Sequence, residues 1–467
     1  MIYIHIPFCR SFCTYCDFYS EVAAKCRDKE DEQKRMFESF SQALGREISL
    51  RAGEMTDEYN TIYIGGGTPS VLPLDVYSDM VGRLADAGIR PPFKEFTFEV
   101  NPEDVVEKGE DYIRGLMALG VDRFSMGVQS FDDGILKWMN RRHDSAVARQ
   151  AYGIMEKAGA GNISIDLIFG LPQLSDDLWR DTLMKALDIS PTGKLPKHIS
   201  AYQLSVEPGS ALAAMVDKGQ WSEADDELCA RQYSILCQVL KEAGYNHYEI
   251  SNFALPGYEA RHNSAYWFHV PYVGLGPGAH SLLITQSPDG DSPQGHRRPI
   301  GLSVFCSKIP GPVAASDDAL LITQSSGDNS PQGHGRPIGL SVFCSKIPGP
   351  VAASDDALLI TRSPDGDSPQ GKWVRRWNEP DLKRYIGNPE GCTDGEELTS
   401  EQIGMERIML ALRTSDGADE EFMVSYCGEE NVNRLLSEGD LERTGGGRLR
   451  IPEERFFVSD RIISEII

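Results

Sequence analysis

Six short apolar runs recur between residues 2 and 205, and helical periodicity lies between them. The runs are IYIHI (2–6), TIYIGG (61–66), EFTFEV (95–100), RFSMGV (123–128), ISIDLIFG (163–170) and HISAYQLS (198–205). The helical stretches lie near 33–51, 74–87, 103–119, 144–158 and 176–188. Runs that are apolar on both faces are typical of buried parallel strands. The pattern predicts an α/β fold, either an open parallel sheet or a (β/α) barrel.

Polar and glycine-rich motifs fall at the ends of these predicted strands. In chain order they are Cys9, Cys13 and Cys16, then GGGTPS (65–70), Glu99 with NPE (101–103), Gln129 and Asp166. In both architectures the functional residues gather just after the carboxyl ends of the strands. We therefore expect these residues to share one site.

The composition excludes several classes of partner. The chain has 467 residues, with 46 Lys and Arg against 70 Asp and Glu, a formal charge of −24. Such a surface repels nucleic acid and anionic membranes. No apolar run reaches the length of about 18 residues that a membrane span needs. We expect neither nucleic acid nor a membrane as a partner.

The amino terminus and the cysteine content point to a reducing compartment. MIYIHIPFC lacks the basic and apolar regions of a signal peptide. Ten cysteines in a chain of this length do not form a disulfide scaffold. The expected location is the cytoplasm, or a mitochondrion or plastid if the amino terminus is truncated.

A tandem repeat interrupts the second half of the chain. Residues 282–319 recur almost unchanged at 320–357, and a third, partial copy fades by Gly371. The copies are rich in Gly, Pro, Ser and Asp, so we expect 282–371 to be a disordered insertion or a translated non-coding stretch. The domains expected are then 1–281, the insertion, and 372–467. The last segment has a helical pattern at 399–413, followed by a helix, a Gly-rich turn between short strands and a final helix, as in a small winged-helix-like α+β domain.

Cys9, Cys13 and Cys16 form a C-x3-C-x2-C motif with Tyr15 and Phe18 beside them. A buried helix carrying three thiols is disfavoured, because a strand and a proline come directly before the motif. Structural zinc needs four ligands, and no second ligand pair is evident. Three thiolates suit an iron–sulfur cluster with one open iron.

Five segments together resemble the radical S-adenosylmethionine (SAM) superfamily. They are YIHIPFCRSFCTYCDF, GGGTPS, SMGVQSF, MNRRH and DLIFGLP, in this order. They resemble the branch that contains oxygen-independent coproporphyrinogen III oxidase and the heme chaperone HemW. The resemblance covers 1–281 and, more weakly, 372–467. It implies a partial (β/α)6 TIM-like barrel with a small C-terminal winged-helix-like α+β domain.

The resemblance also implies cofactors and the residues that hold them. Cys9, Cys13 and Cys16 would ligate a [4Fe–4S] cluster whose fourth iron binds SAM, and one electron from a donor would give a 5′-deoxyadenosyl radical. The positions that match SAM contacts are Tyr3, Tyr15, Gly66, Gly67, Thr68, Glu99, Gln129, Arg141 and Asp166. Simpler interpretations stay open for some of them. The glycines would form a tight turn, Glu99 would cap a helix, and Arg141 and Asp166 would form a structural ion pair.

Two features divide the branch. The oxidases are expected to carry another cysteine two residues after the third, and an N-terminal extension. Here that position is Phe18, and eight residues precede Cys9. HNSAYW (262–267) resembles a motif associated with heme binding in the chaperones, with His262 as an axial ligand. The alternative is a surface histidine beside a buried Tyr–Trp pair.

The resemblance therefore implies a heme chaperone that passes heme to acceptor proteins. Two other functions stay open. One is an oxidase that decarboxylates the propionates of coproporphyrinogen III. The other is a degenerate relative, or a chain that does not fold beyond residue 281.

Overall fold

The computed structural model describes residues 1–22, 30–55, 60–285 and 371–466. Its main feature is a nine-stranded sheet in the order β11-β1-β4-β5-β6-β7-β8-β10-β9. The strands are β1 (Ile2–Ile6), β4 (Thr61–Gly66), β5 (Glu95–Val100), β6 (Arg123–Gln129), β7 (Ile163–Phe169), β8 (His198–Gln203), β9 (Asn246–Glu249), β10 (Asn252–Ala254) and β11 (Val273–Leu275). Neighbouring strands from β11 to β8 are all parallel. The predicted parallel α/β architecture is confirmed.

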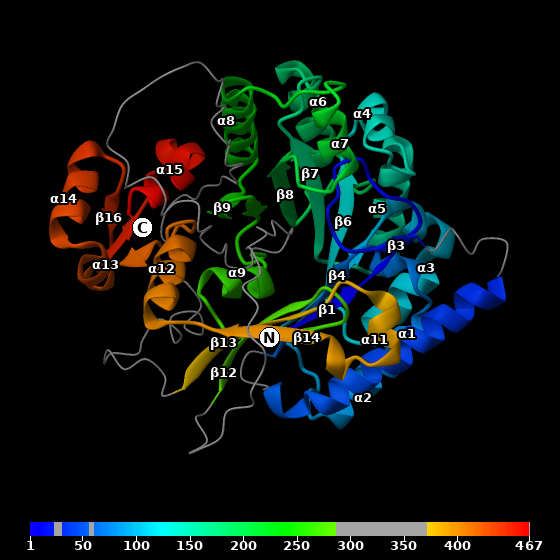
Figure 1. Cartoon of the computed structure of the whole chain (residues 1–467). Helices are drawn as coiled ribbons and strands as arrows, with labels where there is room; N and C mark the ends of the chain where they lie inside the picture. The colour runs from blue at the N-terminus through cyan, green and yellow to red at the C-terminus, as the bar shows by residue number, and fades with distance from the viewer. Residues whose placement is uncertain (23–29, 56–59, 286–370, 467) are drawn as a thin grey trace.

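Helices cover the outer face of this sheet (Figure 1). They are α1 (Glu30–Leu50), α2 (Leu74–Asp86), α3 (Pro102–Ala118), α4 (Asp133–Trp138), α5 (Ser145–Ala158), α6 (Asp176–Leu187), α7 (Ala211–Asp217) and α8 (Asp226–Glu242). The two edges of the sheet, β11 and β9, do not pair with each other among the described strands. The barrel is therefore partial, as expected.

The helix α5 illustrates how the local sequence builds these units. Asp144 caps its first turn by accepting a hydrogen bond from the backbone of Val147, and Gly159 ends it with φ of 104°. The buried side chains Ala148, Ala151, Tyr152 and Met155 recur at helical spacing and form one apolar stripe. Burial of one large apolar side chain contributes about 2 kcal/mol, so this stripe holds the helix on the sheet.

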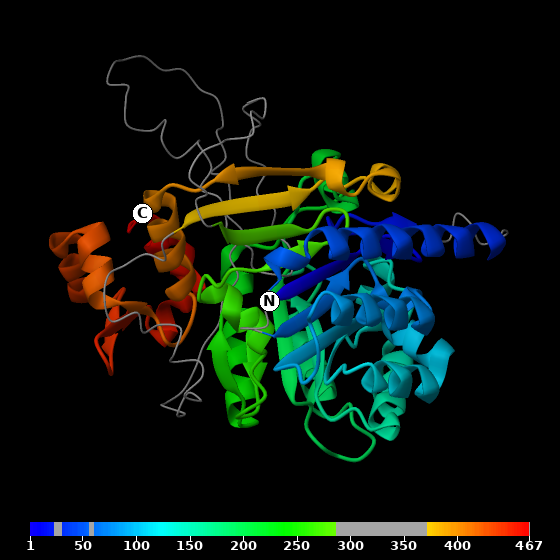
Figure 2. The same cartoon turned by 90° about the horizontal axis from the view of Figure 1, so that it is seen from below.

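A second sheet brings together the strand that precedes residues 286–370 and the strand that follows them. It contains β12 (His280–Thr285), β13 (Lys372–Asn378) and β14 (Thr393–Glu397), all antiparallel. Figure 2 shows it as a layer beside the barrel. The expected domain boundary between 281 and 282 falls inside β12, and the residues of β12 on both sides of it pair with β13. The rest of the repeat, 286–370, lies outside the described residues.

The C-terminal segment folds into short helices and a small sheet. The helices are α11 (Leu382–Gly387), α12 (Ser400–Ala411), α13 (Glu420–Cys427), α14 (Glu429–Glu438) and α15 (Ser459–Ser464), and the sheet has the order β15 (Ala418–Asp419), β17 (Arg448–Arg450), β16 (Glu442–Thr444). The helices followed by a hairpin agree with the predicted winged-helix-like α+β domain. Except for α11, which packs against α1, these helices lie on the far side of the molecule from α1 and α2 (Figure 1).

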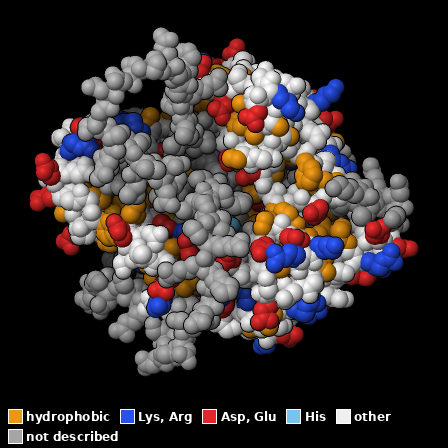
Figure 3. All heavy atoms as spheres, viewed as in Figure 1, with side chains coloured by type: hydrophobic (Ala, Val, Ile, Leu, Met, Phe, Trp, Pro, Cys, Tyr) orange, Lys and Arg blue, Asp and Glu red, His pale blue; other side chains and the backbone are white. Residues whose placement is uncertain are grey.

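Within the described ranges, no helix combines the length and the apolar composition that crossing a bilayer requires. On the described part of the face seen in Figure 3, acidic and basic side chains are scattered, with hydrophobic side chains between them.

Candidate cofactor site

A cavity opens at the carboxyl ends of β1, β4, β5, β6 and β7, with about 770 Å³ of empty space, part of it open to solvent. Most of the residues predicted for the site line it. These are Cys9, Cys13, Cys16, Tyr15, Gly66, Gly67, Thr68, Glu99, Arg141 and Asp166. Most of the strand-end motifs therefore lie around one cavity, whereas Tyr3, Gln129 and His262 do not line it, and the roles of these residues in binding cofactors stay predictions.

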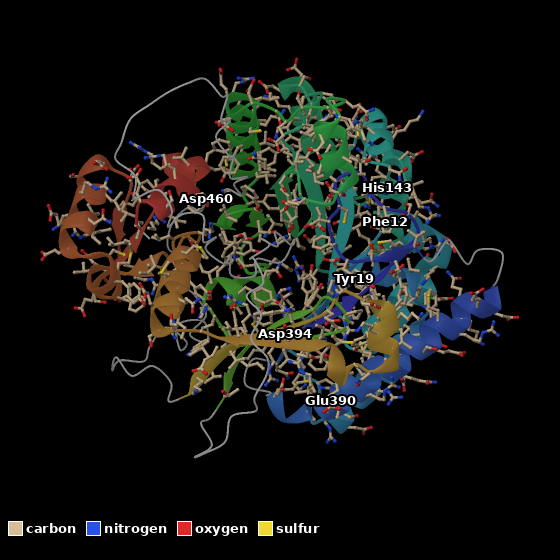
Figure 4. All side chains as sticks on the ribbon, in the orientation of Figure 1. Phe12, Tyr19, His143, Glu390, Asp394 and Asp460 are labelled. Carbon is tan, nitrogen blue, oxygen red and sulfur yellow. The ribbon has the colours of Figure 1, made fainter. Side chains whose placement is uncertain are left out.

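The cysteine loop is irregular and is tied down at both ends. Strand β2 (Phe8–Cys9) pairs with β3 (Glu21–Val22), so the loop returns to its start. The Asn140 amide donates to the Phe12 carbonyl over 2.7 Å, and the backbone of Thr14 donates to the Met139 carbonyl over 3.1 Å. The helix interpretation of the cysteine motif is therefore wrong. Phe12, 51% exposed, marks the outer side of the loop (Figure 4).

The three thiols are partly exposed and face different partners. Cys9 Sγ lies 3.3 Å from Thr68 Oγ1, and Arg141 Nη1 donates to Cys13 Sγ over 3.5 Å. Burial raises the pKa of the Cys9 thiol. As placed, no three His, Cys, Asp or Glu side chains of the described residues are arranged to hold a metal ion. The donor set itself, three thiols with a guanidinium beside one of them, fits a cluster that needs thiolates.

The glycine loop packs directly against the cysteine loop. The backbone of Gly67 donates to the Ile6 carbonyl over 2.8 Å, and Thr68 donates to the Phe8 carbonyl over 2.7 Å. A Cβ on Gly67 would lie 2.8 Å from the Phe8 carbonyl oxygen, and one on Gly66 would lie 2.6 Å from the His5 ring. Gly66 also has φ of 111°, which favours glycine. Packing within the chain therefore requires glycine at both positions even without a ligand, which agrees with the interpretation of this loop as a tight turn.

Arg141 is a buried cation on the cavity wall. Its Nη2 donates to Asn101 Oδ1 over 2.9 Å and to the Gly127 carbonyl over 2.6 Å. Burial alone would lower its pKa, but the charges of Cys13, Tyr15 and Glu103 raise it well above the ordinary value. The guanidinium therefore stays positive beside the thiols.

Asp166 does not pair with Arg141. It accepts a hydrogen bond from Ser125 Oγ at 3.0 Å, and both side chains are buried. The partners that hold Arg141 are Asn101, Gly127 and Cys13. The ion-pair alternative for these two residues is therefore wrong, and both side chains face the cavity.

Glu99 lies on the cavity wall with a tyrosine behind it. Tyr63 donates its hydroxyl to Glu99 Oε1 over 2.8 Å. The residue at the cap position of α3 is Asn101, so Glu99 is not the helix cap. The helix-cap alternative for Glu99 is wrong.

Gln129 and Tyr3 lie behind the cavity wall. Gln129 is fully buried with φ of 68°, and among the described residues neither amide atom has a hydrogen-bond partner. A Cβ on the cavity-lining Gly127 would lie 2.9 Å from its Nε2. A buried amide without partners costs free energy. Tyr3 instead bonds His5 Nδ1 at 3.0 Å.

His262 lies at the opposite, amino ends of the strands. It belongs to α9 (Arg261–Trp267), whose first backbone N–H groups donate to Glu95 at 2.7 and 3.1 Å. Its Nδ1 lies 3.0 Å from Thr61 Oγ1 and its Nε2 lies 3.0 Å from the Tyr266 hydroxyl. Burial lowers the pKa of His262 well below its usual range, so the ring is neutral. The alternative of a surface histidine is wrong.

The contacts made by the NPE residues at the site come from the structure, although the motif itself was expected there. Asn101 bridges Arg141 and Thr68, and Glu103 bonds His143 Nδ1 at 3.2 Å. Burial alone would raise the pKa of Glu103, but the bond to His143 and the charge of Arg141 lower it to about 2. Asn101 and Glu103 belong to the NPE motif, whose position at a strand end was the available signal. Ser125 begins the SMGVQSF motif, but nothing in the sequence indicated its bond to Asp166.

Comparisons with known proteins agree with this site. The model of the radical SAM superfamily matches residues 3–186. The chain is 34% identical over 281 residues to the heme chaperone HemW of Lactococcus lactis, covering 60% of this chain and 69% of the relative. It is 37% identical over 284 residues to the heme chaperone HemW of Synechocystis, covering 60% and 65%. A mitochondrial radical S-adenosyl methionine domain-containing protein 1 of Danio rerio is 31% identical over 308 residues, covering 66% of each chain.

A solved structure has the same fold. Coproporphyrinogen III oxidase (HemN) from Escherichia coli, a radical SAM enzyme, aligns with a TM-score of 0.65 and 17% identity, covering 100% of this chain and 89% of that one. At this identity the likeness concerns the fold alone. The sequence matches carry the assignment further: the chain belongs to the radical SAM superfamily, in the branch that contains the heme chaperone HemW.

Proposed function

We propose that this chain is a radical SAM-type iron–sulfur protein that binds heme and passes it to acceptor proteins. The observation that carries the proposal is the convergence of the cysteine, glycine, Glu99, Arg141 and Asp166 motifs on one cavity at the carboxyl edge of the sheet. The family assignment supports the same cofactors, a [4Fe–4S] cluster and SAM.

Each lining group has a role in holding these cofactors. Cys9, Cys13 and Cys16 would ligate the cluster, and Arg141 would balance the negative charge of the thiolates. The carboxylates of Glu99 and Asp166 offer hydrogen-bond acceptors to SAM. When bound, the cluster and SAM supply one-electron cleavage chemistry. Tyr15, buried beside Cys13 and Cys16, would keep water from the cluster.

Two observations favour the chaperone over the oxidase. The relatives named heme chaperones match over most of their own length. Phe18 also lines the cavity at the position where a fourth cysteine is expected in the oxidases. An aromatic side chain cannot replace a thiol there.

The heme contact proposed for His262 is not preformed. Both ring nitrogens already have partners, and the ring is buried. Ligation of heme iron through Nε2 would require Tyr266 to give up its bond, with Thr61 still orienting the ring. The contact stays a proposal.

An electron donor is the second partner that we propose. The cluster must be reduced before it can act, and the cysteine loop reaches the surface at Phe12. A donor that contacts Phe12 would approach the cluster closely. We also propose a reducing compartment. The relatives include bacterial proteins and a protein named as mitochondrial, so the cytoplasmic location predicted from the sequence stays a prediction.

The proposed function is tested by two assays on anaerobically reconstituted protein. Heme is titrated and the Soret band is followed, and carboxyl-labelled coproporphyrinogen III is incubated with reductant and SAM while carbon dioxide is collected. We expect a saturable Soret shift and no carbon dioxide. Multiple turnovers with SAM consumed in proportion would overturn the chaperone assignment. Absence of both signals would indicate a degenerate relative.

A further inference from the structure

One buried tyrosine joins the cofactor cavity to α9. The Tyr63 hydroxyl donates to Glu99 Oε1 over 2.8 Å at the cavity wall. On its other side, the ring of Tyr63 lies against that of His262, with 5.4 Å between the ring centroids. Tyr63 therefore contacts both Glu99, which the resemblance associates with SAM, and His262 of HNSAYW, which it associates with heme.

The first glycine of the GGGTPS loop makes room for the pair of Tyr63 and Glu99. A Cβ on Gly65 would lie 2.7 Å from the Tyr63 ring and 3.0 Å from the Glu99 carboxyl carbon. Any other residue at this position would push the tyrosine and the carboxylate apart. The hydroxyl of Tyr63 and the absence of a side chain at Gly65 therefore both contribute to the direction in which the Glu99 carboxylate faces.

His262 is built as a support rather than as an open ligand. The residue is 0% exposed, and its nitrogens bond Thr61 and Tyr266. Thr61 is on the same strand as Tyr63, two residues earlier, so the bond to Thr61 fixes the imidazole against Tyr63. Glu95 holds the backbone of α9 in place at the same point.

We propose that His262 acts on the cofactor cavity: it holds Tyr63, and Tyr63 holds the Glu99 carboxylate in the orientation that binds SAM. Tyr63 and His262 are then positioning residues that act through Glu99. This inference rests on the proposed function, because it takes SAM as the ligand of the cavity.

The test measures two affinities on anaerobically reconstituted, cluster-loaded protein. SAM binding is followed by equilibrium dialysis of labelled SAM, and heme binding by the Soret titration. Tyr63→Phe removes one hydroxyl and keeps the ring, so we expect SAM affinity to fall about fivefold, the effect of one lost hydrogen bond to a carboxylate. His262→Ala should lower SAM affinity at least as much. Neither variant should change the iron content, and Tyr63→Phe, which leaves His262 in place, should shift the heme affinity by no more than about twofold.

Further variants separate positioning from a general loss of structure. Tyr63→Phe added to Glu99→Gln should cause no further loss of SAM affinity, because the hydroxyl acts through Glu99. His262→Gln keeps an amide near Nε2 and should recover part of the affinity that His262→Ala loses. Tyr245→Phe is the matched control, since this buried tyrosine donates to the Pro196 carbonyl at 2.6 Å away from the cavity. It should bind SAM as the unchanged protein does.

The outcomes distinguish this inference from the proposed function. If His262→Ala weakens heme binding and leaves SAM affinity unchanged, the inference is overturned and the chaperone function stands. If the unchanged protein binds SAM but no heme, and both variants lose SAM affinity, the inference stands and the chaperone function fails. If His262→Ala does not fold, the Tyr63→Phe variant tests the inference alone. A SAM affinity of Tyr63→Phe equal to that of the unchanged protein would overturn the inference.

Discussion

The two ends of the barrel strands differ in how their polar groups are satisfied. At the carboxyl ends, the amide of Gln129 and Nε of Arg141 have no hydrogen-bond partner in the described part of the chain, and the three cysteines line the cavity. At the amino ends, Glu95 accepts two N–H groups of α9, and both nitrogens of His262 are bonded. Unsatisfied buried groups cost free energy, so a fold keeps them where a ligand completes them.

The amino ends also have exceptions. Among the described residues, Arg123 Nε and, on α9, Asn263 Oδ1 and Trp267 Nε1 are buried without a hydrogen-bond partner. Burial alone would lower the pKa of Arg123, but the charge of Glu95 raises it. The comparison teaches that the same sheet has one edge suited to ligands and one suited to stability, as in other (β/α) folds. Substitutions at the two edges should therefore affect different measurements.

The largest effect is expected at the carboxyl edge. Cys13→Ala should remove most of the iron, about four atoms per chain in the unchanged protein, because three thiolates are needed to hold a [4Fe–4S] cluster. Iron analysis and the visible absorption band of anaerobically purified protein measure this loss. Cys427→Ala is the control, since this thiol lies on α13, outside the cavity. Equal iron in the Cys13→Ala protein would contradict the site.

A pH dependence of stability is expected from Glu249, a buried carboxyl group at the end of β9. Burial raises the pKa of Glu249 from 4.5 to about 7, despite the bonds from Asn252 and the backbone of Ser251. Between these pH values the folded state holds a proton that the unfolded state releases, so the free energy of unfolding falls as pH rises. The fall attributable to Glu249 is on the order of 3 kcal/mol.

Denaturant unfolding at pH 5 and pH 8 measures this dependence. Glu249→Gln cannot titrate, so the variant should lose less stability than the unchanged protein over the same interval. Parallel pH profiles of the two proteins would refute the role of Glu249.

A smaller loss of stability is expected at the amino edge. Glu95→Gln keeps one acceptor for α9 and should lower the free energy of unfolding by about 1–2 kcal/mol, because one backbone N–H loses a charged partner. Thermal unfolding measures the loss, and the iron content should stay unchanged. Loss of iron in this variant would show that the two edges are not independent.

The smallest effect is expected from removal of the repeat. Thr285 and Lys372 are paired neighbours on β12 and β13, with Thr285 Oγ1 donating to the Lys372 carbonyl over 3.2 Å. An Asn-Gly turn in place of 286–371 can therefore close the hairpin. We expect the unfolding temperature and the iron content to stay within error. A large drop in the unfolding temperature would mean that the repeat contributes to the fold.

The barrel could be predicted from the sequence because each of its strands carries a local signal. TIYIGG and EFTFEV are apolar on both faces, and the structure places strands at 61–66 and 95–100, as predicted. The strand at β8 ends at Gln203 rather than 205. The end of β12 could not be predicted, because its partner β13 lies beyond the repeat and pairing across such a distance leaves no local pattern.

The site could be predicted where its residues belong to contiguous motifs. The cysteines and GGGTPS follow strands directly, so their convergence follows from topology. The partners of single side chains could not be predicted in this way. The bonds of Tyr63 to Glu99 and of His262 to Thr61 join different strands and helices, and only the register of the folded sheet brings them together. The burial of His262 was missed for the same reason.

Electron paramagnetic resonance of the reduced, reconstituted protein, with and without SAM, tests the cofactor site most directly. A cluster held by Cys9, Cys13 and Cys16 leaves one iron open. We expect a signal of a reduced [4Fe–4S] cluster whose g values change when SAM is added, and we expect Cys13→Ala to give neither the signal nor the change. A cluster signal that SAM leaves unchanged, or one that persists in Cys13→Ala, would contradict the assignment of this cavity.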